Sequence, residues 1–126
     1  MRVTWRELAA VAIGGLLGTG ARLTIDALVG QPASTLAINV VGSFALGLLV
    51  ARLWSSAAPW LRAGLGAGLL GSFTTFSAVA VTVVELGFSW GGAAYLALTL
   101  ALGLLAAWAG LRIGSRRTPE IDGATE

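Results

Sequence analysis

The sequence contains no cysteine, no histidine and no lysine. Cysteine thiolates and histidine imidazoles are the common ligands of zinc-type sites, so such sites are excluded. The same absences leave no side-chain pair in which a base activates a nucleophile, and we therefore expect the protein not to be an enzyme. A small secreted scaffold is excluded as well, because such folds depend on disulfides.

Charged residues are also scarce. Only 11% of the 126 residues are charged while 56% are apolar, and the mean hydropathy is +0.85. A soluble domain carries about 25% charged residues, so this chain lacks the polar surface needed to face water all round. The net charge is +2, and the arginines lie at the ends of apolar segments without forming a stripe, so nucleic-acid binding is not expected. The composition predicts an integral membrane protein.

Four apolar segments are long enough to cross a bilayer, which takes about 20 helical residues. They cover residues 8–29, 33–53, 60–86 and 90–113. We predict an all-α fold in which residues 1–114 form a four-helix transmembrane subunit and residues 115–126 form a polar, disordered tail. The loops are too short for a further domain, so the function is expected inside the bilayer, in a subunit of a larger assembly.

Glycine is abundant, with 18 residues, many of them inside the predicted helices. Small residues let helices approach closely in lipid, where packing replaces the hydrophobic effect as the adhesive. Close packing therefore accounts for most of these glycines better than a ligand role does.

The third span holds a cluster of hydroxyl side chains in Gly71-Ser72-Phe73-Thr74-Thr75-Phe76-Ser77. One interpretation is a break in the helix, where hydroxyls satisfy freed backbone groups and bare carbonyls point inward to hold a dehydrated cation. The other is an unbroken helix whose hydroxyls bond back to their own turn. The spacing alone leaves both open.

Other polar residues lie in pairs one helical turn apart. Asn39 precedes Ser43 in the second span, and Tyr95 precedes Thr99 in the fourth. Asn39 fits either a functional site or a hydrogen-bonded contact between helices. Arg22 and Asp26 have the spacing of an interfacial ion pair, which is the interpretation we favour for them.

Three motifs carry a resemblance to a known family. They are GGLLGTGAR from Gly14 to Arg22, STLAINVVGSFALG from Ser34 to Gly47 and GLLGSFTTFS from Gly68 to Ser77. In this order they resemble the CrcB/Fluc family of fluoride channels, along nearly the whole chain except the tail. The resemblance implies a dual-topology dimer in which two antiparallel subunits enclose two narrow fluoride paths.

The resemblance also implies roles for individual residues. The backbone carbonyls of Gly71 and Thr74 match those that coordinate a structural sodium ion, to which both subunits contribute. The residues implied for the fluoride path share a hydrogen-bond donor, an aromatic edge or a positive charge: Asn39 as amide donor, Phe76 as the first aromatic, Ser77, Thr75, Thr99 and Tyr95 as polar groups along the helices, and Arg22 near the vestibule.

The sequence departs from the family pattern after Phe76. The pattern TTFSTF places a second phenylalanine three residues after the first, whereas here Ala78 and Val79 follow Ser77. Val79 has no ring edge, so one anion path is expected to be impaired.

The distribution of arginines predicts the orientation. One side of the four spans carries Arg2, Arg6, Arg52, Arg62, Arg112, Arg116 and Arg117, and the other carries only Arg22. This bias predicts one orientation, with both termini in the cytoplasm. With the resemblance, it leads us to expect a multi-pass protein of the plasma membrane. A homodimer needs both orientations, so the bias favours a heterodimer with a paralogue inserted the other way.

Two alternative functions also suit a short four-span protein. A small multidrug exporter needs a titratable carboxylate in mid-membrane, but the acids outside the tail, Glu7, Asp26 and Glu85, lie at the ends of spans. A non-conducting structural subunit of such a channel remains open, because the second phenylalanine is missing.

Overall fold

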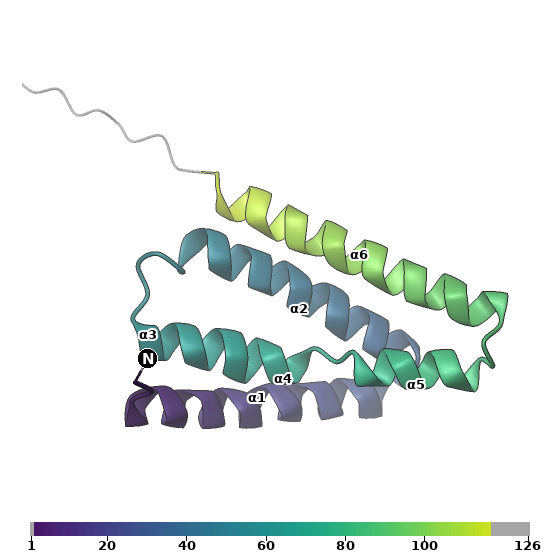
Figure 1. Cartoon of the computed structure of the whole chain (residues 1–126), viewed down its shortest axis with the longest axis horizontal. Coiled ribbons are helices and arrows are strands. Elements are labelled where there is room, and N and C mark those ends of the chain that lie inside the picture. The colour runs from purple at the N-terminus through teal and green to yellow at the C-terminus, as the bar shows by residue number, and fades with distance from the viewer. Residues whose placement is uncertain (1, 117–126) are drawn as a thin grey trace, which may run out of the picture.

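The computed structural model describes residues 2–116, and these residues form helices joined by short connections (Figure 1). The elements are α1 (Trp5–Val29), α2 (Ala33–Arg52), α3 (Pro59–Arg62), the π-helix η1 (Ala63–Leu70), α4 (Gly71–Phe73), α5 (Ser77–Glu85) and α6 (Trp90–Gly114). Segments α3 to α5 follow one another as a single span. Four helices are thus long and apolar enough to cross a membrane, which confirms the predicted all-α, four-span fold. The predicted tail lies outside the described residues from position 117 onward.

Local sequence explains where the helices begin and end. Thr4 and Glu7 form a capping box at the start of α1, with the Thr4 side chain accepting from the Glu7 backbone N–H and the Glu7 carboxylate accepting from that of Thr4. The Ser89 hydroxyl accepts from the Gly92 N–H at the start of α6. Gly30 and Gly87, which follow α1 and α5, have φ angles of 78° and 71° that only glycine adopts without strain.

The helices pack as two close pairs, α1 against η1 and α2 against α6 (Figure 1). A Cβ atom added at Gly18 would overlap the Leu69 carbonyl and the Ser72 hydroxyl. In the other pair, a Cβ at Gly47 would overlap the Ala107 carbonyl, and one at Gly110 that of Phe44. The prediction that the glycines serve close packing is therefore confirmed for these positions.

The third span is irregular in two places. Residues 63–70 form a π-helix, in which hydrogen bonds reach five residues back rather than four. Three glycines of this segment, Gly64, Gly66 and Gly68, present no side chains to their neighbours, and the ring of Trp54 lies beside Gly66. Three residues further on the span breaks at Thr74–Phe76 before resuming as α5.

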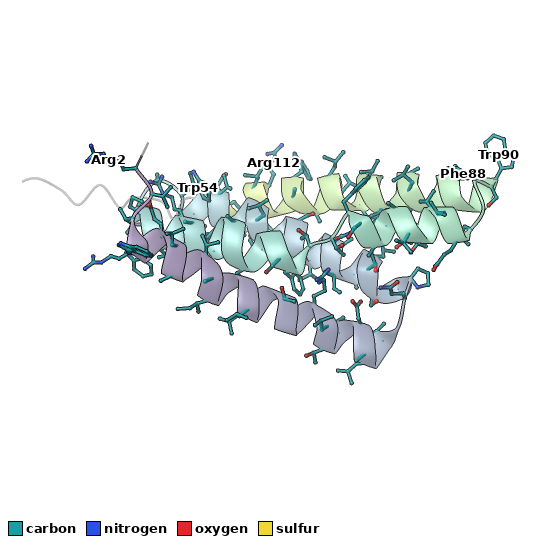
Figure 2. The ribbon with its side chains drawn as sticks, turned by 60° about the horizontal axis from the view of Figure 1, so that its bottom comes forward. Arg2, Trp54, Phe88, Trp90 and Arg112 are labelled. Carbon is teal, nitrogen blue, oxygen red and sulfur yellow. The ribbon has the colours of Figure 1, made fainter. Side chains whose placement is uncertain are left out.

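Most of the arginines lie at one end of the molecule. Arg2, Trp54 and Arg112 lie toward that end and Phe88 and Trp90 at the other (Figure 2). Arg62 donates to the Trp54 carbonyl at 3.1 Å and stacks over its ring at 5.8 Å. Arg112 stacks over Trp108, 5.1 Å from the ring centroid.

A further arginine ties two helices together at this end. Arg52, in the last turn of α2, donates to the Ile113 carbonyl near the end of α6 at 3.5 Å. Arg117, which the orientation argument also counted, lies outside the described residues.

Candidate ion pathway

The break in the third span frees four consecutive carbonyl groups. Thr74 N–H still bonds to the Leu70 carbonyl at 3.0 Å, but its ψ of 154° turns the chain out of the helix. Within residues 2–116, no backbone N–H donates to the carbonyls of residues 71–74. The prediction of a break is confirmed, with the chain leaving the helix three residues after Gly71, which is itself helical at φ −64° and ψ −32°.

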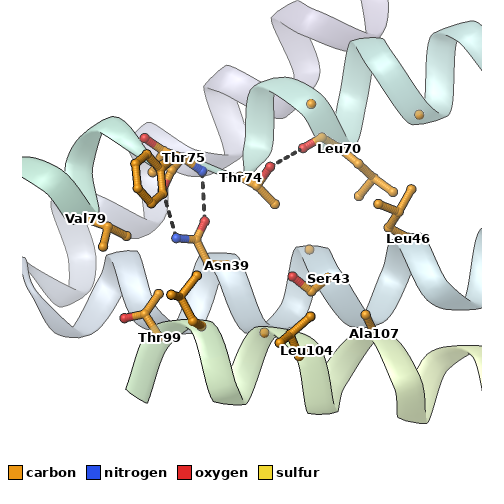
Figure 3. Close-up of a pocket in the computed structure, with 16 residues that line it drawn as sticks. Asn39, Ser43, Leu46, Leu70, Thr74, Thr75, Val79, Thr99, Leu104 and Ala107 are labelled. Atoms are coloured by element: carbon orange, nitrogen blue, oxygen red, sulfur yellow. Dashed lines mark hydrogen bonds between the residues drawn. The ribbon is translucent and has the colours of Figure 1, made fainter. Parts of the chain in front are cut away.

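Asn39 replaces the missing helical bonds at the break. Its Nδ2 donates to the Thr75 carbonyl at 2.8 Å, and its Oδ1 accepts from the Thr75 N–H at 2.8 Å (Figure 3). The side-chain amide thus pairs with both backbone polar groups of one residue as a neighbouring strand would, from a position 36 residues earlier in the chain. A primary amide has two N–H donors, so one remains after the Thr75 carbonyl is satisfied.

The hydroxyl groups divide according to the side of the break on which they lie. Before it, Ser72 and Thr74 bond back to the carbonyls of Gly68 at 2.7 Å and Leu70 at 3.0 Å. At it, the Thr75 Oγ1 accepts from the Ala78 N–H at 3.2 Å and so caps α5. The same Thr75 oxygen lies 3.1 Å from the Ser77 hydroxyl.

A pocket of about 420 Å³ opens beside Asn39, between α2, the third span and α6 (Figure 3). It contains six of the residues implied by the resemblance: Asn39, Gly71, Thr74, Thr75, Phe76 and Thr99. No charged side chain lines it. Among residues 2–116 no three metal-binding side chains of the histidine, cysteine, aspartate or glutamate type lie together, so a cation here would depend on backbone carbonyls.

Two side chains of the pocket differ sharply in exposure. Phe76 is 67% exposed in the isolated chain, whereas Val79, at the position of the family's second phenylalanine, is 1% exposed. Thr99 is 6% exposed, and its Oγ1 has no hydrogen-bond partner among the described residues. The lining of the pocket therefore includes an exposed ring, a buried hydroxyl without a partner among the described residues and an amide N–H, all without formal charge.

Three of the implied residues lie outside the pocket. Ser77 is next to it through its contact with Thr75. The Tyr95 hydroxyl instead donates to the Pro32 carbonyl at 3.3 Å. Arg22 on α1 does not line the pocket, and its expected ion pair with Asp26 is wrong: the buried Arg22 Nε and Asp26 Oδ1 each lack a hydrogen-bond partner in the described chain.

Sequence reasoning did not single out the remaining groups that shape this site. Gly42 lies where α2 meets the break, and a Cβ there would overlap the methyl group of Thr74. Gly103 on α6 faces Ser43, with 3.6 Å from an added Cβ to the Ser43 hydroxyl. The helical spacing of Asn39, Gly42 and Ser43 along one face of α2 was the available signal.

A family profile described as "CrcB-like protein, Camphor Resistance (CrcB)" matches residues 9–111. The chain belongs to the CrcB family. The matched range includes every residue that lines the Asn39 pocket, and the four apolar helices make this CrcB-family chain a multi-pass membrane protein.

Similar curated relatives of this CrcB-family chain are named as fluoride channels. "Fluoride-specific ion channel FluC 2" of Halalkalibacterium halodurans is 37% identical, with 98% of this chain and 100% of the relative covered. "Fluoride-specific ion channel FluC" of Rhodospirillum centenum is 41% identical, covering 86% of this chain and 94% of the relative. "Fluoride-specific ion channel FluC 1" of Mycobacterium bovis is 42% identical, covering 81% and 85%.

Proposed function

We propose that this chain is a subunit of a fluoride-specific ion channel that lets fluoride leave the cytoplasm passively across the plasma membrane. The observation that carries the proposal is the uncharged pocket at Asn39, in a chain whose relatives are named fluoride-specific ion channels. Those names describe channels rather than enzymes, in agreement with the expectation from composition. The pocket is suited to replace the water of a small, strongly hydrated anion.

The chemistry of each group supports this role. The second N–H of Asn39 and the unpaired Thr99 hydroxyl are donors for the anion. The edge of the exposed Phe76 ring carries partial positive charge and faces an anion without a counter-charge. Conduction requires that the ion bind weakly enough to leave, and a pocket free of arginine meets that condition. Ser77, Tyr95 and Arg22 are assigned by the resemblance to the approaches of the path.

A structural sodium ion fits the same break. Sodium is held by oxygen atoms, and the carbonyls of residues 71–74 accept no backbone hydrogen bond within the described chain. We assign the carbonyls of Gly71 and Thr74 to it, shared with the second subunit. Preparing the channel with N-methylglucamine in place of sodium is expected to lower its Tm, and an unchanged Tm would count against the site.

The channel is proposed to be a dual-topology dimer. The excess of arginine at one end supports an orientation with both termini of this chain in the cytoplasm, and we propose that the second subunit is inserted the other way. Because one chain with such a bias does not supply both orientations, we favour a heterodimer with an oppositely biased paralogue over a homodimer.

The test is fluoride efflux from liposomes, recorded with a fluoride electrode. Thr99→Val keeps the shape of the side chain and removes an unpaired donor, so efflux is expected to slow. Thr24→Val is the matched control, because the Thr24 hydroxyl bonds back to Gly20 at 2.8 Å on the surface of α1. Phe76→Ile is expected to abolish efflux by removing the ring edge. Equal slowing by the two threonine variants would contradict the proposed path.

The same assay separates the possible assemblies. Rapid, chloride-excluding efflux from this chain alone establishes a self-sufficient homodimer and overturns the heterodimer. If the folded protein alone gives no fluoride efflux, and efflux appears after co-expression with the paralogue, the heterodimer is supported. A non-conducting subunit is the second candidate, because the buried Val79 supplies no ring edge. Val79→Phe tests this candidate: efflux is restored only if the missing ring is what prevents conduction.

A further inference from the structure

A second cavity lies on the other side of the molecule from the ion pathway, along the first part of α1. It has a volume of about 370 Å³ and is lined by Arg6, Ala9, Ala10, Ile13 and Trp60. It shares no residue with the Asn39 pocket. We call it the α1 groove.

The α1 groove has the form of a trough running into the membrane. Its α1 residues lie at positions 6, 9, 10 and 13, which form one stripe of a helix. At a rise of 1.5 Å per residue the stripe is roughly 10 Å long. The small side chains of Ala9 and Ala10 form the floor of the groove and leave space above them, while Trp60 of α3 forms its wall.

The charge in this groove has no partner in the part of the chain that the structure describes. Among residues 2–116 the guanidinium of Arg6 makes no hydrogen bond, ion pair or ring contact, whereas Arg62 on α3 is engaged by Trp54. The nearby Glu7 carboxylate is held in the capping box, where Oε2 accepts from the Thr4 N–H at 2.7 Å and its hydroxyl at 3.1 Å. Arg6 therefore presents an unpaired positive charge at the mouth.

The rest of the groove is apolar and open. Ile13 is 59% exposed and Trp60 is 42% exposed. An indole at the end of a span lies at the level of the lipid headgroups, and the aliphatic groups below it lie at the level of acyl chains. An arginine above an apolar trough between two membrane helices is complementary to a phosphate attached to a hydrocarbon chain.

We propose that the α1 groove binds one anionic phospholipid, with the phosphate on Arg6 and an acyl chain over Ala9, Ala10 and Ile13. The lipid fills the space between α1 and α3 at the arginine-rich end. This site is independent of fluoride conduction and rests on the structure of the single chain.

The test is native mass spectrometry of the detergent-purified full chain titrated with phosphatidylglycerol or phosphatidylcholine of the same acyl composition. Arg6→Gln is expected to lower retention of phosphatidylglycerol about fivefold, the effect of one arginine near an anionic membrane surface, and to leave phosphatidylcholine unchanged. Arg116→Gln removes a charge from the same end outside the groove and is expected to leave both unchanged.

A second pair of variants tests the trough. Ala9→Leu fills the floor and is expected to reduce retention of phosphatidylglycerol, whereas Ala12→Leu, an exposed α1 position outside the groove, is not. Equal losses from Arg6→Gln and Arg116→Gln would overturn the proposal, because the preference would then come from the general charge of this end. Full retention by Ala9→Leu would overturn it as well.

Discussion

Replacing Asn39 by alanine is the sharpest test of how the broken span is held together. The substitution removes two hydrogen bonds of 2.8 Å and leaves the N–H and carbonyl of Thr75 without partners. Polar contacts between membrane helices average about 0.6 kcal/mol, so two of them set a lower bound of about 1 kcal/mol. If both Thr75 groups stay buried and unpaired, the loss is about 2–6 kcal/mol, at about 1–3 kcal/mol each.

We expect a value near 2 kcal/mol, because these bonds are only part-buried and water can replace some of what is lost. The measurement is the free energy of unfolding in mixed micelles titrated with dodecyl sulfate and followed by tryptophan fluorescence. Ser43→Ala is the control, since Ser43 lies one turn further along α2, lines the same pocket and makes no hydrogen bond among residues 2–116. An unfolding free energy for Asn39→Ala within about 0.5 kcal/mol of the control would refute the reasoning, because surface-like changes stay in that range.

Three further predictions concern packing, capping and orientation. Gly18→Ala forces α1 away from the third span and is expected to lower the unfolding free energy by about 1–3 kcal/mol, whereas Gly15→Ala meets nothing within 4 Å and is expected to be neutral or stabilising. Equal effects at the two glycines would contradict the close-packing account. Thr75→Val removes the cap of α5 and is expected to cost about 1 kcal/mol, with faster amide hydrogen exchange in the first turn of α5. Because the chain has no cysteine, a single cysteine introduced by Ser115→Cys or by Ser89→Cys reports the orientation of its end of the molecule. We expect Ser115→Cys to be labelled only from the cytoplasm. Equal labelling from both sides would contradict the heterodimer.

The number and extent of the spans could be predicted because a bilayer imposes a length and an apolar composition on each crossing segment. The expected start of the second span at residue 33 is also where α2 begins, and the ends of the expected first and third spans differ from those of the structure by at most three residues. The close-packing interpretation was correct for glycines such as Gly18, Gly47 and Gly110 for the same reason, since in lipid a small residue mainly permits close approach.

The position of the break could not be derived from local sequence. Gly71 is the most flexible residue of the cluster, yet it is helical, and the chain leaves the helix at Thr74. The cause lies in α2, where Asn39 supplies the partner that makes an unwound Thr75 tolerable. Because this contact joins residues 36 positions apart, the residue spacing within the third span does not predict where the helix breaks.

Two other features show the same limit. The spacing of Arg22 and Asp26 permits an ion pair, but Arg22 Nε and Asp26 Oδ1 have no hydrogen-bond partner among the described residues, because spacing restricts only the positions of the two residues on the helix and not their rotamers. The π-helix over residues 63–70 also had no signal that distinguished it from an α-helix, since glycine at alternate positions fits either.

The arginine contacts at the arginine-rich end limit how the orientation of this protein can be re-engineered. Arg52 and Arg62 each bond to a backbone carbonyl, and Arg62 and Arg112 each cover a tryptophan ring. Deleting them to weaken the insertion bias would also loosen the connection between α2 and α3 and the end of α6. A reversed subunit is therefore better made by adding positive charge at the Phe88–Trp90 end. The charge bias that sets the orientation then changes, while the arginine contacts that hold the helices together stay intact.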